Sequence, residues 1–177
     1  NVYLPQVQTI ENSFLAYNKT LKVIELPECR EIGMGFLENN TNIKNVYLPQ
    51  AQVIEDYFLR YNEAIEVIKL PECRVIGRYF LEFNKNIKSI YLPKAEHLGF
   101  DFLRNNETLD IIELPNARRI YEGFLESNKN IKNIYLPECL ILPSNLETIS
   151  QIQSAEKKDT NKNKCKKLTL NLLRKKI

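Results

Sequence analysis

Thiols are the most reactive side chains in this sequence, which contains four cysteines. Cys29, Cys73 and Cys139 are separated by multiples of 22 residues, in a column that otherwise holds Val or Ala, so we expect small buried core positions. Cys29 and Cys73 would lie about 9.6 Å apart at the strand spacing of a sheet, whereas a disulfide needs Cα atoms within roughly 7 Å. We therefore predict free core thiols, and an exposed Cys165 that is able to form an adventitious dimer.

Other groups that commonly perform chemistry are sparse. His97 is the single histidine, and the cysteines are too widely spaced for a zinc knuckle. The sequence has no nucleophile elbow, phosphate-binding loop or dinucleotide fingerprint. The recurring glutamates are expected to line solvated loops. We therefore predict no catalytic residue, no metal site and no cofactor, and a protein that is not an enzyme.

The outward strand positions carry residues suited to recognition. The residue before each Leu-Pro pair alternates between tyrosine and a charged residue, and the residue two places earlier alternates between Asn or Ser and Val or Ile, which gives a 44-residue period. Tyrosine offers a large contact area, a polar tip and a low entropy cost. The candidate ligand-binding residues are Tyr3, Glu25, Tyr47, Lys69, Tyr91, Glu113 and Tyr135, together with Asn45, Ser89 and Asn133.

Two other interpretations of this pattern stay open. Tyrosine and valine would lie diagonal to one another and shield each other on an exposed sheet. A duplicated two-repeat block would also leave a 44-residue period without any selection for binding. A neighbouring column contains both positive and negative charges, which argues against a nucleic-acid-binding surface on this face. The residues of this column are Lys22, Lys44, Glu66, Lys88, Asp110 and Lys132.

A strict repeat sets these positions. Seven of the eight prolines recur every 22 residues, as do six of the eight phenylalanines, each followed by leucine and then by an asparagine. These columns are Pro5, Pro27, Pro49, Pro71, Pro93, Pro115 and Pro137; Phe14, Phe36, Phe58, Phe80, Phe102 and Phe124; and Asn18, Asn40, Asn62, Asn84, Asn106 and Asn128. Because one unit cannot bury its apolar face alone, the repeat predicts a stacked solenoid.

Each unit predicts one strand and one tight turn. Ile24 and Leu26 alternate with outward residues, which predicts a strand of three or four residues that the following proline ends. The segment from Phe36 to Asn40 is too short for a full helix, so we predict a single 3-10 or α turn. A buried asparagine amide there would satisfy backbone groups of its own coil and of the next.

The repeat resembles the BspA-like, or Treponema-type, leucine-rich repeat over about residues 2–142. The family's Ala-Phe pair is Phe-Leu here, its later cysteine is asparagine, and the period is 22 instead of the commoner 23. The resemblance implies an α/β, right-handed, horseshoe-like solenoid with a short parallel sheet on one face and helical or 3-10 turns on the other. It also implies a surface, secreted or host-directed binding protein. The matching positions are Leu70-Pro71, Ile76-Gly77 and Phe80.

The pattern ends after Pro137, where no Phe-Leu pair follows. We divide the chain into a solenoid of six to seven repeats (residues 1–142), a C-terminal cap (143–154) and a basic flexible tail (155–177). Ser144-Asn145-Leu146-Glu147 has the spacing of a helix capping box, so the cap is expected to be helical. The net charge of +3 combines +8 in residues 157–177 with −5 in the remainder.

These observations favour a monomeric module that binds a protein partner through its strand face. The alternatives are a structural spacer or display array, and contact with an anionic membrane or nucleic acid through the tail at residues 157–177. The tail is otherwise expected to be a solvated terminus. We expect a cell-surface or secreted protein, although unpaired cysteines fit a reducing compartment equally well.

Overall fold

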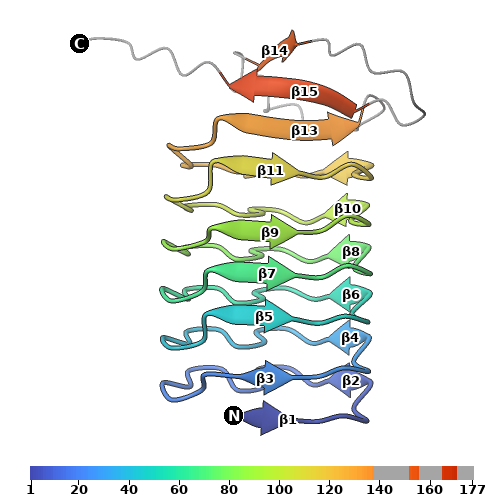
Figure 1. Ribbon diagram of the computed structural model, residues 1–177, viewed down its shortest axis with the longest axis vertical. Helices are drawn as coiled ribbons and strands as arrows, with labels where there is room; N and C mark the ends of the chain where they lie inside the picture. Colours follow the sequence, from blue (N-terminus) through green and yellow to red (C-terminus); the bar gives the residue numbers. More distant parts are fainter. Residues whose placement is uncertain (138–151, 156–164, 171–177) are drawn as a thin grey trace.

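The computed structural model describes residues 1–137 and the backbone of residues 152–155 and 165–170. Residues 1–137 wind into coils that stack in a nearly straight column (Figure 1). Equivalent residues of successive coils are 22 positions apart, as in the pairing of Asn45 with Val67. None of the described residues lies in a helix, so no helix in this part of the chain could cross a membrane.

One side of the column, which we call the strand face, is built from the strands that precede each Leu-Pro pair. Their inward residues alternate with exposed ones, as the sequence predicts, and adjacent strands run parallel. Hydrogen bonding divides them into sets of order β1-β3, β5-β7-β9 and β11-β13. The strands are β1 (Val2–Tyr3), β3 (Ile24–Glu25), β5 (Asn45–Tyr47), β7 (Val67–Lys69), β9 (Ser89–Tyr91), β11 (Ile111–Glu113) and β13 (Asn133–Pro137).

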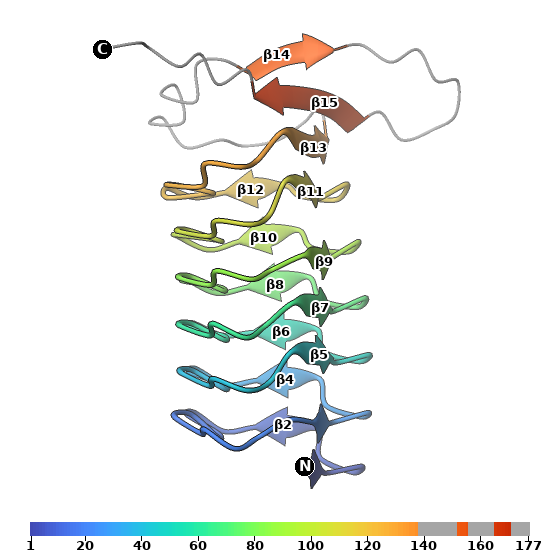
Figure 2. The same ribbon diagram turned by 60° about the vertical axis from the view of Figure 1, so that its left-hand side comes forward.

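A second parallel sheet, which the sequence pattern did not predict, forms another side of each coil (Figure 2). Each of its six strands has two residues, the first turned outward and the second a buried Ile or Leu of the core. The strands pair in unbroken order β12-β10-β8-β6-β4-β2. They are β2 (Thr9–Ile10), β4 (Glu31–Ile32), β6 (Val53–Ile54), β8 (Val75–Ile76), β10 (His97–Leu98) and β12 (Arg119–Ile120).

The Phe-Leu-x-x-Asn segments form the third side, the turn edge, and the predicted helical turn is wrong there. The angle φ is positive at every second residue of this segment in every coil, for example 54° at Leu15 and 59° at Tyr17. A helix would bond each N–H within its own segment. Here the amide of Leu37 instead donates to Phe14 O of the preceding coil at 3.2 Å, and the amide of Tyr17 donates to Glu38 O of the next coil at 2.7 Å.

The fold is therefore an all-β solenoid of parallel strands and turns, which corrects the α/β class. A horseshoe arises when helices on one side of a solenoid need more width than the strands on the other. In this chain backbone hydrogen bonds join the coils both at the second sheet, as from Gly33 N to Ile10 O (2.8 Å), and at the turn edge. All sides then keep a similar spacing between coils, so the column lacks the horseshoe curvature (Figure 1).

The interior is a set of columns of identical or similar residues. The phenylalanines of the turn edge stack ring on ring, with centroids 5.6 Å apart for Phe36–Phe58 and 5.2 Å apart for Phe58–Phe80. Both of these pairs are completely buried. Cys29 and Cys73 also lie buried in the core, as predicted, and both are free thiols. Cys139 falls outside the described residues.

The asparagine column clamps each coil to the preceding one. The Nδ2 of Asn62 donates to Leu37 O at 2.9 Å and to Arg60 O of its own coil at 3.2 Å. The same pair of bonds recurs at Asn40, Asn84, Asn106 and Asn128. The predicted bond to the asparagine's own coil is confirmed, whereas the neighbouring coil that the amide contacts is the preceding one and not the next.

Beyond the repeats, two further strands join the strand face. β15 (Cys165–Leu170) pairs antiparallel with β13 and also with β14 (Ile152–Ala155), which places β15 beside the last coil and β14 beyond β15 (Figure 1). The remaining residues of the predicted cap and tail, including the expected capping box, lie outside the described residues. The division of the chain after Leu142 stays a prediction.

The asparagine clamp predicts a marked loss of stability when it is removed. Asn62→Ala leaves two backbone carbonyls without this donor in a fully buried position, so the free energy of unfolding should fall by about 1–3 kcal/mol. Urea denaturation followed by circular dichroism measures this change. Asn45→Ala, at an exposed position of β5, is the matched control and should change it by less than about 0.5 kcal/mol. Equal effects would contradict the clamp.

The positive φ angles of the turn edge predict which residues are tolerated at Gly35. The preference should depend on backbone conformation and not on the room available for a side chain. Gly35 has a φ of 70°, and a Cβ there would come no closer than 3.5 Å to Ser13 Oγ. Asn tolerates this conformation while β-branched Val does not, so Gly35→Val should lower the free energy of unfolding by roughly 1–3 kcal/mol more than Gly35→Asn. The same urea titration compares the two variants. A helical turn would give no such preference for Asn.

Candidate functional site

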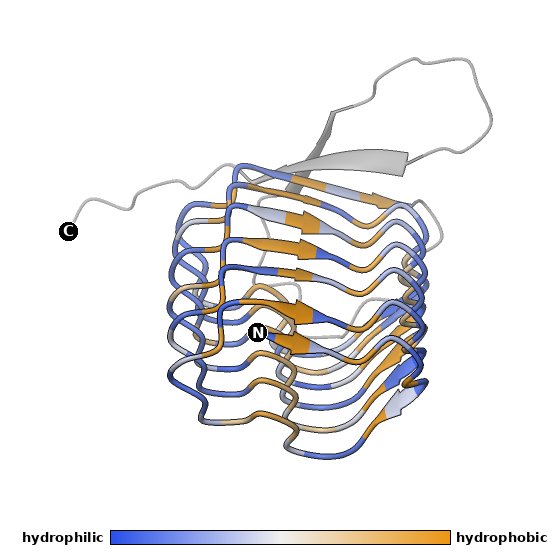
Figure 3. Ribbon diagram, turned by 60° about the horizontal axis from the view of Figure 1, so that its bottom comes forward, coloured by the Kyte–Doolittle hydropathy of each residue, from blue (hydrophilic) through white to orange (hydrophobic). Residues whose placement is uncertain are grey.

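The strand face carries the largest exposed aromatic side chains near its centre. Tyr47 is 56% exposed and Tyr91 is 53% exposed, although their inward neighbours are the buried Val46 and the partly buried Ile90. The alternation of the strand therefore turns the rings outward, because successive side chains point to opposite faces. Figure 3 shows hydrophobic residues along the strands of this face between more hydrophilic connections.

The strand register brings tyrosines and charged residues together. Tyr47 pairs with Lys69, and Lys69 pairs with Tyr91, so the three side chains form one row across β5, β7 and β9. Val67 pairs with Asn45 and Ser89, which places it diagonal to both tyrosines, as the sequence pattern predicts.

A hollow of about 550 Å³ lies over this row. Its lining includes the predicted residues Asn45, Tyr47, Lys69 and Tyr91. Three further lining residues, Val46, Val67 and Pro71, were not among the predicted site residues. The 44-residue alternation contained the signal for Val67, which occupies the same face, whereas the proline was interpreted only as the end of a strand.

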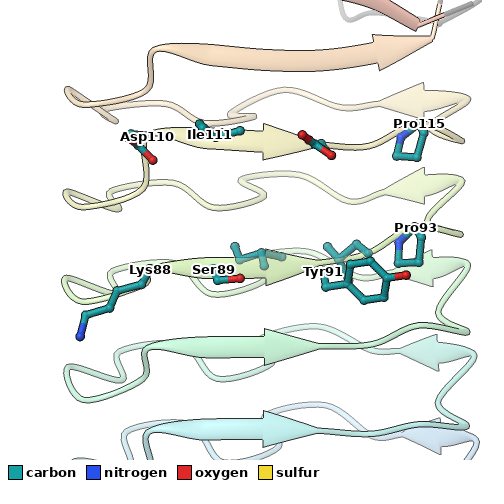
Figure 4. Close-up of a pocket in the computed structure, with 10 residues that line it drawn as sticks. Lys88, Ser89, Tyr91, Pro93, Asp110, Ile111 and Pro115 are labelled. Carbon is teal, nitrogen blue, oxygen red and sulfur yellow. The ribbon is translucent and has the colours of Figure 1, made fainter.

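A second, smaller hollow of about 260 Å³ lies between β9 and β11, where the strand face has no ladder (Figure 4). Elsewhere Leu70 N donates to Tyr91 O and Leu114 N to Tyr135 O, but among the described residues no such bond joins Leu92 N to Glu113 O. Ile90, which is the inward residue of β9, is only partly buried as a consequence.

The other predicted site residues do not join the central row. Ser89 and Glu113 line the smaller hollow between β9 and β11. Tyr3 and Glu25 form a separate exposed pair at β1 and β3. The last two, which are Asn133 and Tyr135, lie on β13, where they are partly buried and where β15 pairs along the strand.

Outside the row of Tyr47, Lys69 and Tyr91, most columns of charged residues form ion pairs between successive coils. Glu66 lies between Lys44 at 3.5 Å and Lys88 at 2.5 Å, which holds the pKa of its carboxyl below its usual value, mainly through the hydrogen bond from Lys88. On the second sheet, Glu96 contacts Arg74 at 2.9 Å and Arg118 at 3.3 Å. By contrast, Glu25, Lys69 and Glu113 form no ion pair with any described residue, because tyrosines occupy the same position of the neighbouring coils.

The turn edge also satisfies its own charges. Arg60 Nε donates to Glu82 at 2.7 Å, and its guanidinium lies 4.5 Å from the ring centroid of Tyr61 and 5.1 Å from that of Tyr79. Glu82 is nearly buried. This burial raises the pKa of its carboxyl, and the opposing effect of Arg60 is smaller. The cluster is therefore a structural one that leaves little unsatisfied for a ligand.

The described residues include no group of three or more His, Cys, Asp or Glu placed to hold a metal ion. His97 lies on the exposed side of β10. The buried Cys73 thiol is poorly suited to act as a nucleophile, because desolvation raises its pKa to about 12. The candidate site on the described part of the chain is therefore the hollow that Tyr47, Lys69 and Tyr91 line.

The turn-edge cluster predicts a pH dependence of stability. Because the folded state holds the Glu82 proton to a higher pH than the unfolded state does, its stability falls as pH rises through the raised pKa. Glu82→Gln removes this titration, so the free energy of unfolding of the variant should improve relative to that of the wild type as pH rises above the usual glutamate pKa of about 4. Urea titrations across this range test the sign. Parallel curves for the two proteins would contradict it.

Comparison with known families supports the repeat assignment. A family model described as the BspA type leucine rich repeat region matches the chain in six copies, over residues 1–110 and 52–154. Neither the comparison with curated proteins nor that with solved structures gave a match. The family match spans most of the chain and confirms the resemblance that the Leu-Pro and Ile-Gly positions indicate. The chain belongs to the BspA-type leucine-rich repeat family.

Proposed function

We propose that this chain is a non-enzymatic module that binds a protein partner on its strand face, centred on Tyr47, Lys69 and Tyr91. The observation that carries the proposal is the contrast in charge pairing. Lys69 lies between two exposed tyrosines without an ion pair to a described residue, whereas the columns containing Glu66 and Glu96 neutralise themselves between coils. A partner would supply the missing counter-charge.

The geometry of the hollow suits such contacts. Two tyrosines provide broad apolar surfaces with hydroxyl groups at their tips, and these rings bind at a low entropy cost because they have few rotatable bonds. The long side chain of Lys69, which also lines the hollow, would reach an acidic group by a charge-assisted hydrogen bond. Tyrosines surrounding a charged centre are typical of the residues that dominate binding energy in protein interfaces.

A spacer or display array is the main rival. Leucine-rich repeats commonly mediate protein interactions, which favours binding over display for a member of this family. A spacer also needs only the bonds that join the coils. It gives no reason for a hollow of about 550 Å³ rimmed by two tyrosines that are each more than half exposed.

A displayed library of random peptides tests the proposal while the partner is still unidentified. Peptides selected on the wild-type chain should bind the double variant Tyr47→Ala/Tyr91→Ala at least about tenfold more weakly, because the two removed rings supply much of the contact area. Fluorescence polarisation of each purified peptide measures the loss. Thermal unfolding should show little change, since both side chains are exposed.

Tyr17→Ala is the matched control, because Tyr17 is 68% exposed but lies on the turn edge. Its binding should equal that of the wild type. Peptides that bind the double variant as tightly as the wild type would overturn the assignment of this face. If the selected peptides lose binding only to the Tyr17→Ala variant, the binding site lies on the turn edge instead.

A further inference from the structure

The spacing of the two tyrosines limits the kind of chain that fits between them. Tyr47 and Tyr91 occupy equivalent positions of β5 and β9, with only β7 between them in a continuous ladder. Adjacent strands in a sheet are about 4.8 Å apart, so the two Cα positions are about 9.6 Å apart along the column. A ligand that lies along the column and contacts both rings must repeat at this distance.

Of the regular peptide conformations, polyproline II fits this distance best. It has three residues per turn and rises about 3.1 Å per residue, so residues i and i+3 lie on one side about 9.3 Å apart. A β-strand repeats on one side every two residues, at about 6.7 Å. An α-helix returns to the same side after seven residues, at about 10.5 Å. The mismatch is about 0.3 Å for polyproline II and roughly three times as large for the helix.

The chemistry of the hollow matches the same ligand. Proline rings pack well on tyrosine faces, and domains that bind proline-rich segments use aromatic-lined grooves of this kind. Polyproline II makes no internal hydrogen bonds, so its carbonyls are free to accept bonds from the hydroxyls of Tyr47 and Tyr91 and from the amide of Asn45. Val67 and Pro71 give the hollow an apolar margin on both sides of Lys69.

Lys69, which lines the hollow, determines the charge that a ligand should carry. Lys69 lies midway between the two tyrosines in the strand register and has no ion pair with a described residue. Along the axis of a polyproline II segment, the residues at i+1 and i+2 lie between the two that contact the tyrosines, and they project about 120° to either side of that contact. A glutamate or aspartate at one of them would come within reach of the Lys69 ammonium group.

We infer that the strand face binds a proline-rich segment in the polyproline II conformation, running along the solenoid, with prolines at i and i+3 on Tyr47 and Tyr91 and an acidic residue between them over Lys69. This inference rests on the proposed function and names the chemical class of the partner.

Synthetic peptides test the inference. The first probe is a fluorescent seven-residue peptide with proline at every position except glutamate at positions two and five. The second replaces each proline by valine, the third replaces glutamate by lysine, and the fourth is a helical peptide with leucines seven residues apart and a glutamate between them. Fluorescence polarisation should show that the first peptide binds at least about tenfold more tightly than each of the others.

Variants of the protein then test the individual contacts. Tyr47→Ala/Tyr91→Ala should abolish binding of the glutamate-proline peptide, and Tyr17→Ala should leave it unchanged. Lys69 is exposed on β7. The substitution Lys69→Glu should therefore reverse the preference for the charge of the peptide, so that the lysine-proline peptide binds more tightly than the glutamate-proline peptide. A reversal would be difficult to obtain from misfolding, which would weaken both peptides together.

The outcomes of these experiments are distinguishable. If the valine or helical peptide binds as tightly as the proline peptide, the inference is overturned. It is also overturned if no proline peptide binds while library-selected peptides still depend on Tyr47 and Tyr91, and the proposed function then stands. If binding of the selected peptides does not depend on either tyrosine, both the proposed function and the inference are contradicted.

Discussion

Hydrogen bonding between successive coils is the interaction on which the rest of this structure depends. No coil within residues 1–137 contains a ladder of its own, so most of its backbone hydrogen bonds go to the coils on either side, as at Leu37 N to Phe14 O and at Asn62 Nδ2 to Leu37 O. The non-glycine residues at positive φ in the turn edge would each be unfavourable in isolation. They persist because this conformation points alternate peptide groups toward opposite neighbours.

The same constraint explains the columns of similar residues. A spacing of about 4.8 Å places each side chain directly over its equivalent, which suits the stacked rings of Phe58 and Phe80 but brings like charges into repulsion. Alternating charges along a column solves this problem, as in Lys44, Glu66 and Lys88. On the strand face tyrosine takes the alternate positions instead, so that the charges are kept apart and remain available.

The sequence predicted the parts of this architecture that depend on hydropathy and spacing. The strands of the strand face, the buried phenylalanines and the clamping asparagines follow from periodicity alone. The backbone conformation of the turn edge does not follow from periodicity. Positive φ is expected at glycine and asparagine, whereas here leucine and tyrosine residues adopt it, as at Leu15, Tyr57 and Leu59. The second sheet was missed because its strands have only two residues. The sequence placed Tyr47, Lys69 and Tyr91 on one exposed face, as the strand register shows, but the hollow over them depends on how the side chains are arranged, which periodicity does not record.

The strand β15 has a further consequence. A column of identical parallel coils has no intrinsic length limit, because each exposed end offers the same pattern of backbone groups that joins the coils internally. β15 runs antiparallel along β13 and occupies the edge of that strand with a different hydrogen-bond pattern. A further parallel coil therefore cannot pair directly with β13, and the outermost strand of this sheet is the short β14. On this sheet the column of parallel coils thus ends in two antiparallel strands instead of another repeat.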